Sequence, residues 1–378
     1  MHSTERILTT HVGSLPRPED LTRLIWAKAE GHPIDDALLE RRVTESINDV
    51  VTRQRDAGID LISDGEIGKP GFSSYIYERY SGFGSPLEAV TNAEDLADYP
   101  EVAVMLLGGM EAIQHIEMRH CEGAIELKDA EPIKREIATF AEALGDTPRG
   151  EAFLNAPTPG QVVHNNPNAY YSSRDAYLRA AGEALRVEYQ AIIDAGFNLQ
   201  LDSPDLAMSA HYKFGDGVAD HQDHVRAAIK ALNHAIDGLP PERLRLHLCW
   251  GNYAGPHNRD VPLRSVIEPV LTANVETISF EGANPTHEYE WEVFRDVKLP
   301  DDKVLMPGVI DVCNTRLEHP RTVAQRLIRF AEVVGREQVI ASTDCGFATF
   351  AGVHFIPPSL VWGKLQALAA GAELASVR

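Results

Sequence analysis

The chain has 378 residues and a formal net charge of −21 at pH 7, with 44% hydrophobic and 24% charged residues. This length can bury a large core, in one domain or in two smaller ones, and the acidity argues against nucleic acid or an anionic membrane as a partner. The first residues contain no apolar stretch of signal-peptide type, and no apolar run is long enough to span a bilayer. We therefore expect a cytoplasmic protein without a membrane partner.

Four cysteines are spread along the chain: Cys121, Cys249, Cys313 and Cys345. Four cysteines in a chain of this length are too few to form a disulfide framework. We expect reduced thiols that serve metal binding or chemistry. For Cys313 the alternative is a small buried side chain with no further role.

Strand-like runs alternate with helical patterns along most of the chain. We predict strands at residues 7–12, 59–64, 150–154, 197–202, 245–248, 277–281, 303–310 and 338–343. Apolar residues at helical spacing predict helices near residues 21–29, 43–51, 173–195, 217–236, 266–271, 322–334 and 359–375. Strands that alternate with helices form parallel sheets, and eight such units predict a closed (β/α)8 TIM barrel.

The stretch from residue 69 to about residue 146 interrupts this alternation after the second strand. It contains an aromatic-rich segment at 72–80 and a predicted hairpin near 123–127. We interpret it as an insertion because no linker composition bounds it, so residues 1–378 are predicted to form a single barrel domain. An open doubly wound sheet is the alternative, although no glycine-rich dinucleotide fingerprint follows an early strand.

Polar side chains stand at the carboxyl ends of the predicted strands, where barrels of this class build their active sites. These residues are Ser14, Glu66, Asn155, Asp202, His247, Cys249, Glu281, Asp311 and Cys345. Residues two apart in a strand face the same side, so His247 and Cys249 can address one point. Neutral imidazole and thiolate are donors that zinc prefers. Donors that come from strands far apart in the sequence favour a catalytic zinc site over a structural zinc site. For this pair alone, a buried core cysteine and histidine is the alternative.

Six motifs in order along the chain resemble the cobalamin-independent methionine synthase family. They are residues 8–17 (LTTHVGSLPR), 61–66 (LISDGE), 199–204 (LQLDSP), 247–252 (HLCWGN), 307–311 (PGVID) and 344–347 (DCGF). The chain is similar to the single-barrel members, which lack the additional N-terminal barrel of the long synthases. The same superfamily includes epoxyalkane:coenzyme M transferases.

The resemblance implies a zinc ion held by His247, Cys249, Glu281 and Cys345. In the family, zinc holds the acceptor thiol as a thiolate, which then attacks an alkyl carbon. The physical reason is that a thiol with a pKa near 8.5 is mostly protonated at neutral pH, and a bound divalent cation deprotonates it. The implied reaction is methyl transfer to homocysteine, giving methionine.

The resemblance also assigns the amino-acid end of the acceptor. Glu66 and Asp202 would meet the ammonium of homocysteine and Ser14 its carboxylate, while Asp311 would be the catalytic aspartate. Two carboxylates facing an ammonium match its charge, whereas they would repel the sulfonate of coenzyme M.

Two departures from the family pattern concern the alkyl donor. Cys313 stands where the long synthases carry a proton-donating histidine, and Ser203 stands where they carry a glutamate. These differences leave the donor open among a methyl-folate, methylcobalamin and an epoxide. Thiol addition to an epoxide is therefore an alternative activity, and a zinc-binding barrel without turnover is an alternative of another class. A decarboxylase of the uroporphyrinogen type is disfavoured by the zinc ligands.

Overall fold

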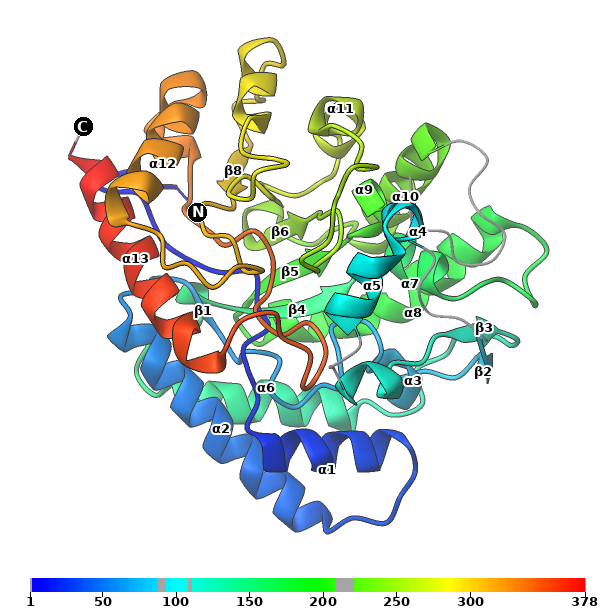
Figure 1. The fold of residues 1–378 in the computed structure, drawn as a ribbon. Coiled ribbons are helices and arrows are strands. Elements are labelled where there is room, and N and C mark those ends of the chain that lie inside the picture. The colour runs from blue at the N-terminus through cyan, green and yellow to red at the C-terminus, as the bar shows by residue number, and fades with distance from the viewer. Residues whose placement is uncertain (1, 88–92, 108–110, 209–220, 378) are drawn as a thin grey trace.

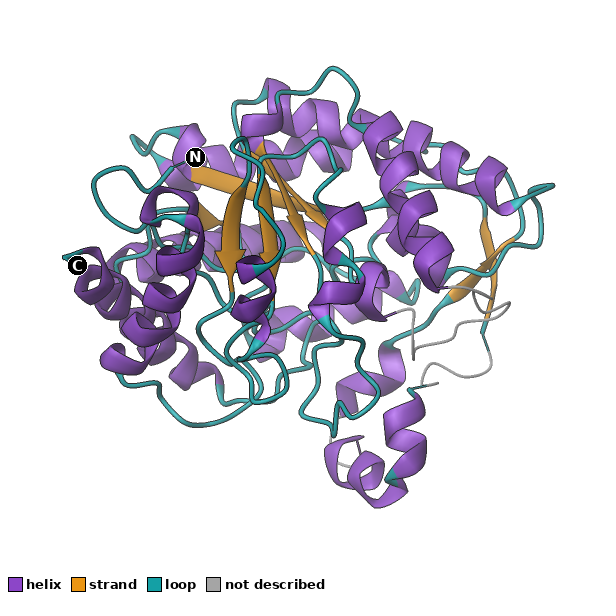
Figure 2. Ribbon diagram, turned by 90° about the horizontal axis from the view of Figure 1, so that it is seen from above, coloured by secondary structure: helices purple, strands orange, loops and turns teal. Residues whose placement is uncertain are grey.

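The computed structural model describes residues 2–87, 93–107, 111–208 and 221–377, and six of its strands form one parallel sheet (Figure 1). The sheet order is β1 (Ile62–Ser63), β4 (Ala152–Pro157), β5 (Asn198–Asp202), β6 (Leu244–His247), β7 (Thr277–Phe280) and β8 (Val304–Pro307). The sheet is curled, and helices surround it when it is seen from above (Figure 2). The predicted parallel sheet of alternating strands and helices is thus confirmed for six strands.

The remaining two predicted strands, at residues 7–12 and 338–343, are extended segments with isolated bridges. Thr9 pairs in parallel with Ala341, and the Leu61 N–H donates to the Thr9 carbonyl at 3.0 Å. On the other side, the Ile340 N–H donates to the Leu305 carbonyl at 2.9 Å. The two segments therefore lie between β1 and β8, the two edge strands of the sheet.

The longer helices correspond to predicted ones, except α6, which lies in the stretch between residues 69 and 146 where no helix was predicted, and α2, which is longer than predicted. They are α1 (Glu19–Ala29), α2 (Asp36–Asp56), α6 (Glu131–Leu144), α8 (Arg174–Asp194), α10 (His221–Ala235), α12 (Pro320–Val334) and α13 (Pro358–Ser376). The shorter ones are α3 (Ile76–Arg79), α4 (Glu94–Asp98), α5 (Pro100–Leu107), α7 (Pro159–Asn165), α9 (Asp205–Met208) and α11 (Ile267–Val270).

Local chemistry fixes several helix starts. The Asp35 carboxylate accepts from the Leu38 N–H at 3.1 Å, and the Ser173 hydroxyl accepts from the Ala176 N–H at 3.1 Å, which satisfies donors that the first helical turn leaves open. The start of the helix predicted at 217–236 lies outside the described residues, and α10 begins at His221. Within the part of the chain that the structure describes, no helix is both long enough and apolar enough to cross a membrane.

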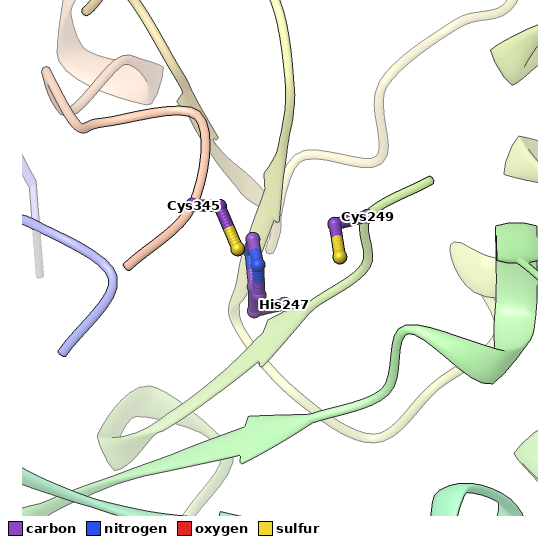
Figure 3. Close-up of side chains that lie close together, drawn as sticks. All are labelled: His247, Cys249 and Cys345. Atoms are coloured by element: carbon purple, nitrogen blue, oxygen red, sulfur yellow. The ribbon is translucent and has the colours of Figure 1, made fainter. Parts of the chain in front are cut away.

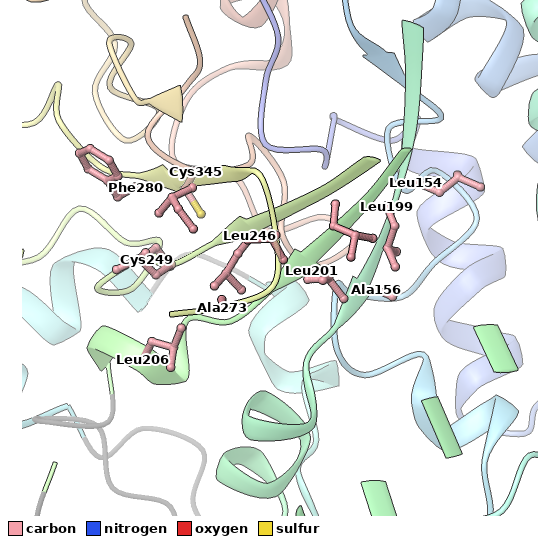
Figure 4. Packing of buried hydrophobic residues seen from close by; sticks show 14 of the residues in the cluster. Leu154, Ala156, Leu199, Leu201, Leu206, Leu246, Cys249, Ala273, Phe280 and Cys345 are labelled. Carbon is pink, nitrogen blue, oxygen red and sulfur yellow. The ribbon is translucent and has the colours of Figure 1, made fainter. Parts of the chain in front are cut away.

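Strand periodicity divides the side chains between the inside of the curled sheet and the outer helix layer. The outward set, which includes Leu154, Leu199, Leu201 and Leu246, joins the main buried core (Figure 4). The inward set is partly apolar, as in the cluster of Leu61, Val304, Met306 and Ile340.

The rest of the inward set is polar. Parallel register places Asn155 beside Gln200, and Gln200 beside Arg245. One step further along the strands it places Asp202 beside His247, and His247 beside Ser279. The inward polar residues of adjacent strands are therefore neighbours in space.

The stretch between residues 69 and 146 contains an antiparallel pair, β2 (Phe83–Pro86) with β3 (Arg119–Cys121). Tyr80 also bridges Leu127, so residues 119–127 pair with the segment 80–86 and form no hairpin of their own near 123–127. The last element, α6, packs in the outer helix layer, where Phe140 stacks on Phe197 with ring centroids 5.2 Å apart. The irregular part of the stretch thus ends before α6.

Candidate metal and thiol-binding site

Three predicted ligands meet at the carboxyl end of the sheet. His247 is the last residue of β6, Cys249 follows two residues later, and Cys345 follows the extended segment 338–343. The donor atoms of these buried side chains all lie within 4.8 Å of one another. Figure 3 shows the three side chains gathered at the end of β6. The i, i+2 spacing and the proximity of two distant segments thus produce one cluster with nitrogen and sulfur donors.

The His247 ring is oriented by the neighbouring strand. Its Nδ1 lies 3.2 Å from the Ser279 hydroxyl, whereas its Nε2 is buried and has no hydrogen-bond partner. Burial lowers the pKa of His247 to about 4, and Arg245 contributes in the same direction. A neutral ring that donates from Nδ1 presents the lone pair of Nε2 to the cavity, as metal-binding histidines do.

The two cysteines share a hydrogen bond. The Cys345 thiol donates to the Cys249 sulfur, which lowers the pKa of Cys249 and raises that of Cys345. Cys249 is therefore the more acidic of the two thiols. Together with the unpartnered Nε2, this donor set fits zinc.

Glu281, the predicted fourth ligand, lies outside the group of donor atoms within 4.8 Å of one another. One of its oxygens accepts from the Trp250 N–H at 2.9 Å, and the other accepts from the Asn284 side chain at 2.7 Å. Burial raises the pKa of Glu281 to about 7. The structure thus brings together three of the four predicted ligands and holds the fourth by hydrogen bonds.

The predicted amine-binding residues line the same cavity as the metal donors, a space of about 180 Å³. Asp202 accepts from Asn155 at 2.9 Å and from Gln200 at 2.8 Å, while one oxygen of Glu66 is buried without a partner. Burial is the main cause that raises the pKa of Asp202 and brings that of Glu66 to about 8, and the Asp202 charge adds to the effect on Glu66.

Ser14 lines the same cavity. Its hydroxyl accepts from the Ala348 N–H at 3.4 Å. A Cβ at Gly346 would lie 1.9 Å from the Ser14 oxygen, so this close approach requires glycine.

Asp311 lies in a second cavity of about 380 Å³ that shares Cys345, Gly251, Asn252 and Tyr253 with the first. Its carboxylate accepts from the Cys313 N–H at 2.8 Å, and the Cys313 thiol donates to the Asn252 side chain at 3.1 Å. The structure therefore separates Asp311 from Ser14, Glu66 and Asp202. Ser203 is not among the residues that line either cavity, and its hydroxyl donates to Asp205 at 2.7 Å.

Gln200 and Lys69 support the site and were not predicted, whereas Asn155 was predicted as a strand-end residue without a role. Gln200 and Asn155 both donate to Asp202 and to the Val12 carbonyl. Lys69 donates to the Asn155 carbonyl at 2.8 Å. The sequence could have revealed Gln200, because it lies two residues before Asp202 in the same strand and therefore faces the same side.

Comparison with known proteins supports the motif analysis. The chain is 23% identical to a methionine synthase from Sulfurisphaera tokodaii, over 97% of this chain and 91% of that protein. It is also 23% identical to a 2-hydroxypropyl-CoM lyase from Xanthobacter autotrophicus, over 97% and 94%. A B12-independent methionine synthase from Shewanella sp. W3-18-1 shares the fold, with a TM-score of 0.72 and 21% identity over 98% of this chain and 97% of that one. No family model matches the chain.

Fold, site and relatives together define an enzyme of the class that transfers a methyl or alkyl group to a thiol acceptor. Within that class, the motifs predict a resemblance to the cobalamin-independent methionine synthase family. Relatives named methionine synthase, at 23% and 24% identity over 97% of this chain, confirm this resemblance.

Proposed function

We propose that the chain is a zinc-dependent methyltransferase that uses homocysteine as its acceptor and gives methionine. The observation that carries this proposal is the composition of one cavity. A buried nitrogen and sulfur donor set lies in it, and a pair of carboxylates with a serine lies in it as well. An amino acid with a thiol side chain matches this composition, because its sulfur fits the metal donors and its ammonium and carboxylate fit the two acids and the serine.

His247, Cys249 and Cys345 would hold the ion, and Glu281 would complete the set. The fit rests on the buried Nε2 without a partner and on two sulfur donors that lie within 4.8 Å of each other and of the histidine donor. A bound zinc ion supplies the positive charge that keeps a thiol ionised near neutral pH.

The chain's own residues would bind and orient the acceptor. Glu66 and Asp202 would accept from its ammonium, with Asp202 fixed by its two amide donors. Ser14 would meet its carboxylate. The Shewanella protein was solved in complex with selenomethionine, and we propose that this cavity takes an amino acid of the same kind.

The transfer itself is a displacement. The thiolate sulfur attacks the methyl carbon, so a carbon–sulfur bond forms while the bond from that carbon to the donor breaks. Asp311 would act as the catalytic aspartate from the second cavity, which Cys345 also lines.

We further propose that residues 1–378 form one (β/α)8 domain, with residues 7–12 and 338–343 as the first and last strands of the barrel.

Thiol addition to an epoxide is the second candidate. The relative named 2-hydroxypropyl-CoM lyase and the many apolar residues in the cavity wall favour it. The two carboxylates disfavour coenzyme M as its thiol, because a sulfonate would be repelled there.

The test combines metal analysis with spectroscopy of the cobalt-substituted protein. We expect about one zinc per chain, a change in the sulfur-to-cobalt absorption on adding homocysteine, and no such change with homoserine, which lacks the thiol. Methionine formation from a methyl donor would complete the case. Full activity of a metal-free protein in a strong chelator would contradict it, and thiol ligation without turnover with any donor would favour the non-catalytic barrel.

A further inference from the structure

The turn that carries Glu66 has a strained backbone. Gly65 and Glu66 lie just after β1 and adopt consecutive left-handed conformations, with φ angles of 71° and 55°. Among the residues that the structure describes, Glu66 and His257 are the only two non-glycine residues with a positive φ. A side chain makes this conformation unfavourable, so a residue such as glutamate keeps it only where surrounding contacts impose it. The contacts around Glu66 therefore decide where its carboxylate points.

Hydrogen bonds on both sides hold the backbone of Glu66. Its N–H donates to the Asp64 carboxylate at 3.0 Å. Its carbonyl accepts from the Lys69 N–H at 3.0 Å and from the Arg17 guanidinium at 2.7 Å. Asp64 and Lys69 lie within three residues of Glu66, whereas Arg17 lies 49 positions earlier in the chain. Arg17 thus ties the strained residue to a distant segment.

The Arg17 guanidinium joins two segments that line the cavity. Its second nitrogen donates to the Ala348 carbonyl at 2.8 Å, and the Ala348 N–H in turn donates to the Ser14 hydroxyl at 3.4 Å. Arg17 is only 8% exposed, and burial lowers its pKa to about 10, so the side chain remains charged at neutral pH. One buried cation therefore contacts Glu66 and a direct neighbour of Ser14, which are the residues proposed to meet the ammonium and the carboxylate of the acceptor.

Arg17 and the Glu66 carboxylate face different spaces. Glu66 lines the cavity with the metal donors, and one of its carboxylate oxygens is buried without a hydrogen-bond partner. Arg17 lines a separate groove between α1, α2 and α13. Both hydrogen bonds from its guanidinium go to backbone carbonyls. The carboxylate of Glu66 is thereby left available for an ammonium group.

We propose that Arg17 is a positioning residue for the acceptor, which it serves by holding Glu66 in the left-handed conformation that directs its carboxylate into the cavity. This inference rests on the proposed function, because Glu66 is one of the two groups that accept from the acceptor ammonium. Loss of the guanidinium removes a charge-assisted hydrogen bond to the strained residue. Glu66 then relaxes to a negative φ, and its carboxylate leaves the cavity.

The experiment compares two ligands that differ only in the amino group. They are methionine and γ-methylthiobutyrate, and their affinities for the zinc-loaded protein are measured by calorimetry. The ratio of the two affinities reports on the ammonium contact, because both ligands carry the carboxylate and the thioether. Arg17→Met should lower this ratio about tenfold, the lower end of what loss of a hydrogen bond to a charged group gives. An unchanged ratio would overturn the inference.

A double-mutant cycle tests whether Arg17 acts through Glu66. Glycine adopts the left-handed conformation without strain, so Glu66→Gly removes the carboxylate and leaves the turn intact. In this background Arg17→Met should not lower the ratio further, because the group that it positions is gone. A second tenfold loss in the Glu66→Gly background would show that Arg17 acts by another route and would overturn the inference.

Arg243→Met is the matched control for a merely structural role. Arg243 also donates to two backbone carbonyls, those of Ile193 at 3.3 Å and Phe197 at 2.6 Å, but it precedes β6 at the end of the sheet opposite the site. This variant should lower thermal stability and leave the ratio unchanged. An equal fall of the ratio in Arg243→Met would mean that the ratio follows general stability, which would overturn the inference. If Arg17→Met does not fold, Arg17→Lys carries the same test, since it keeps the charge but loses the planar fork.

A crystal structure of the Arg17 variant separates this inference from the proposed function. Glu66 should leave the left-handed conformation there, and this result needs no ligand. If Glu66 is unchanged in the variant while the wild type prefers methionine, the inference is wrong and the proposed acceptor stands. If Glu66 moves but the wild type does not prefer methionine to γ-methylthiobutyrate, the proposed acceptor is wrong and the positioning role of Arg17 stands.

Discussion

The cavity has a metal end, formed by the candidate donors His247, Cys249 and Cys345, and a carboxylate end, formed by Glu66 and Asp202. The two ends lie one strand apart but consist of different chemical groups. Asp202 of β5 is paired in register with His247 of β6, so one residue of each end is a neighbour of the other. The metal end consists of groups that carry little charge alone, since burial lowers the pKa of His247 to about 4. The carboxylate end consists of two acids whose pKa values burial raises. Substitution of any one metal donor should therefore abolish metal binding. Substitution of one carboxylate should only weaken binding of the acceptor.

The largest effect should follow loss of a metal donor. Cys249→Ser or Cys345→Ser should abolish zinc retention and lower activity by more than about 100-fold, because removing even a residue that supports a ligand costs metal sites ~10–100-fold. The fold should remain, since a large barrel core does not depend on a metal as a zinc finger does. Zinc analysis and circular dichroism of each variant measure the two effects. Global unfolding of either variant would mean that the site is structural.

A graded effect is expected at the carboxylate end. Asp202→Asn should weaken homocysteine binding by about 1.5–3 kcal/mol, the range for a hydrogen bond to a charged group. Mercaptoethanol, which has no ammonium, serves as the control ligand and should bind almost unchanged. Isothermal titration of the zinc-loaded variant gives both values. Unchanged homocysteine affinity in both Asp202→Asn and Glu66→Gln would rule out this amine pocket.

The pH dependence of binding should separate the two ends further. Glu66 has a pKa raised to about 8, so below that pH it is mostly protonated and cannot pair with an ammonium as an anion. Methionine affinity should therefore fall as the pH decreases from 8 to 6, by up to about tenfold per pH unit. Methionine has no titrating thiol, so the profile reports on the amine pocket. Glu66→Gln should flatten the profile, and a flat profile in the wild type would contradict the assignment.

Sequence periodicity predicted that His247 and Cys249 lie close together, because one ends β6 and the other follows it by two residues. The spacing of His247 and Cys249 determines that both face inward, and only Cys345 had to come from a distant segment. Glu281 shows the limit of that reasoning. Its partners are the Trp250 N–H and Asn284, and the 31-residue separation from Trp250 gives no local signal for the contact.

The fold shows the same division between local and non-local information. Helix bounds follow from capping residues and apolar spacing, so α8, α12 and α13 begin and end within two residues of the prediction. The irregular pairing of residues 7–12 and 338–343 depends on neighbours more than 300 positions away, as between Thr9 and Ala341. The pairing of residues 119–127 with 80–86 is likewise set by tertiary packing, which the local pattern at 123–127 does not show.

The smallest effect is expected at Cys313, and it tests whether this cysteine contributes to metal binding. This cysteine replaces the histidine of the long synthases, yet its thiol donates to Asn252 at 3.1 Å and lines the second cavity. It is absent from the group of donors within 4.8 Å of one another, so Cys313→Ala should leave zinc at about one per chain. Loss of one weak neutral hydrogen bond should change activity by no more than about 1 kcal/mol, or roughly fivefold.

Cys121→Ala is the matched control, because Cys121 is fully buried, its thiol donates to the Gly123 carbonyl at 3.5 Å, and it lines neither cavity. It should lower thermal stability without changing zinc content or kinetics. If Cys313→Ala lowers kcat far more than Cys121→Ala does at equal zinc content, Cys313 acts on the leaving group from the second cavity. The alkyl donor would then contact residues of both cavities during the reaction.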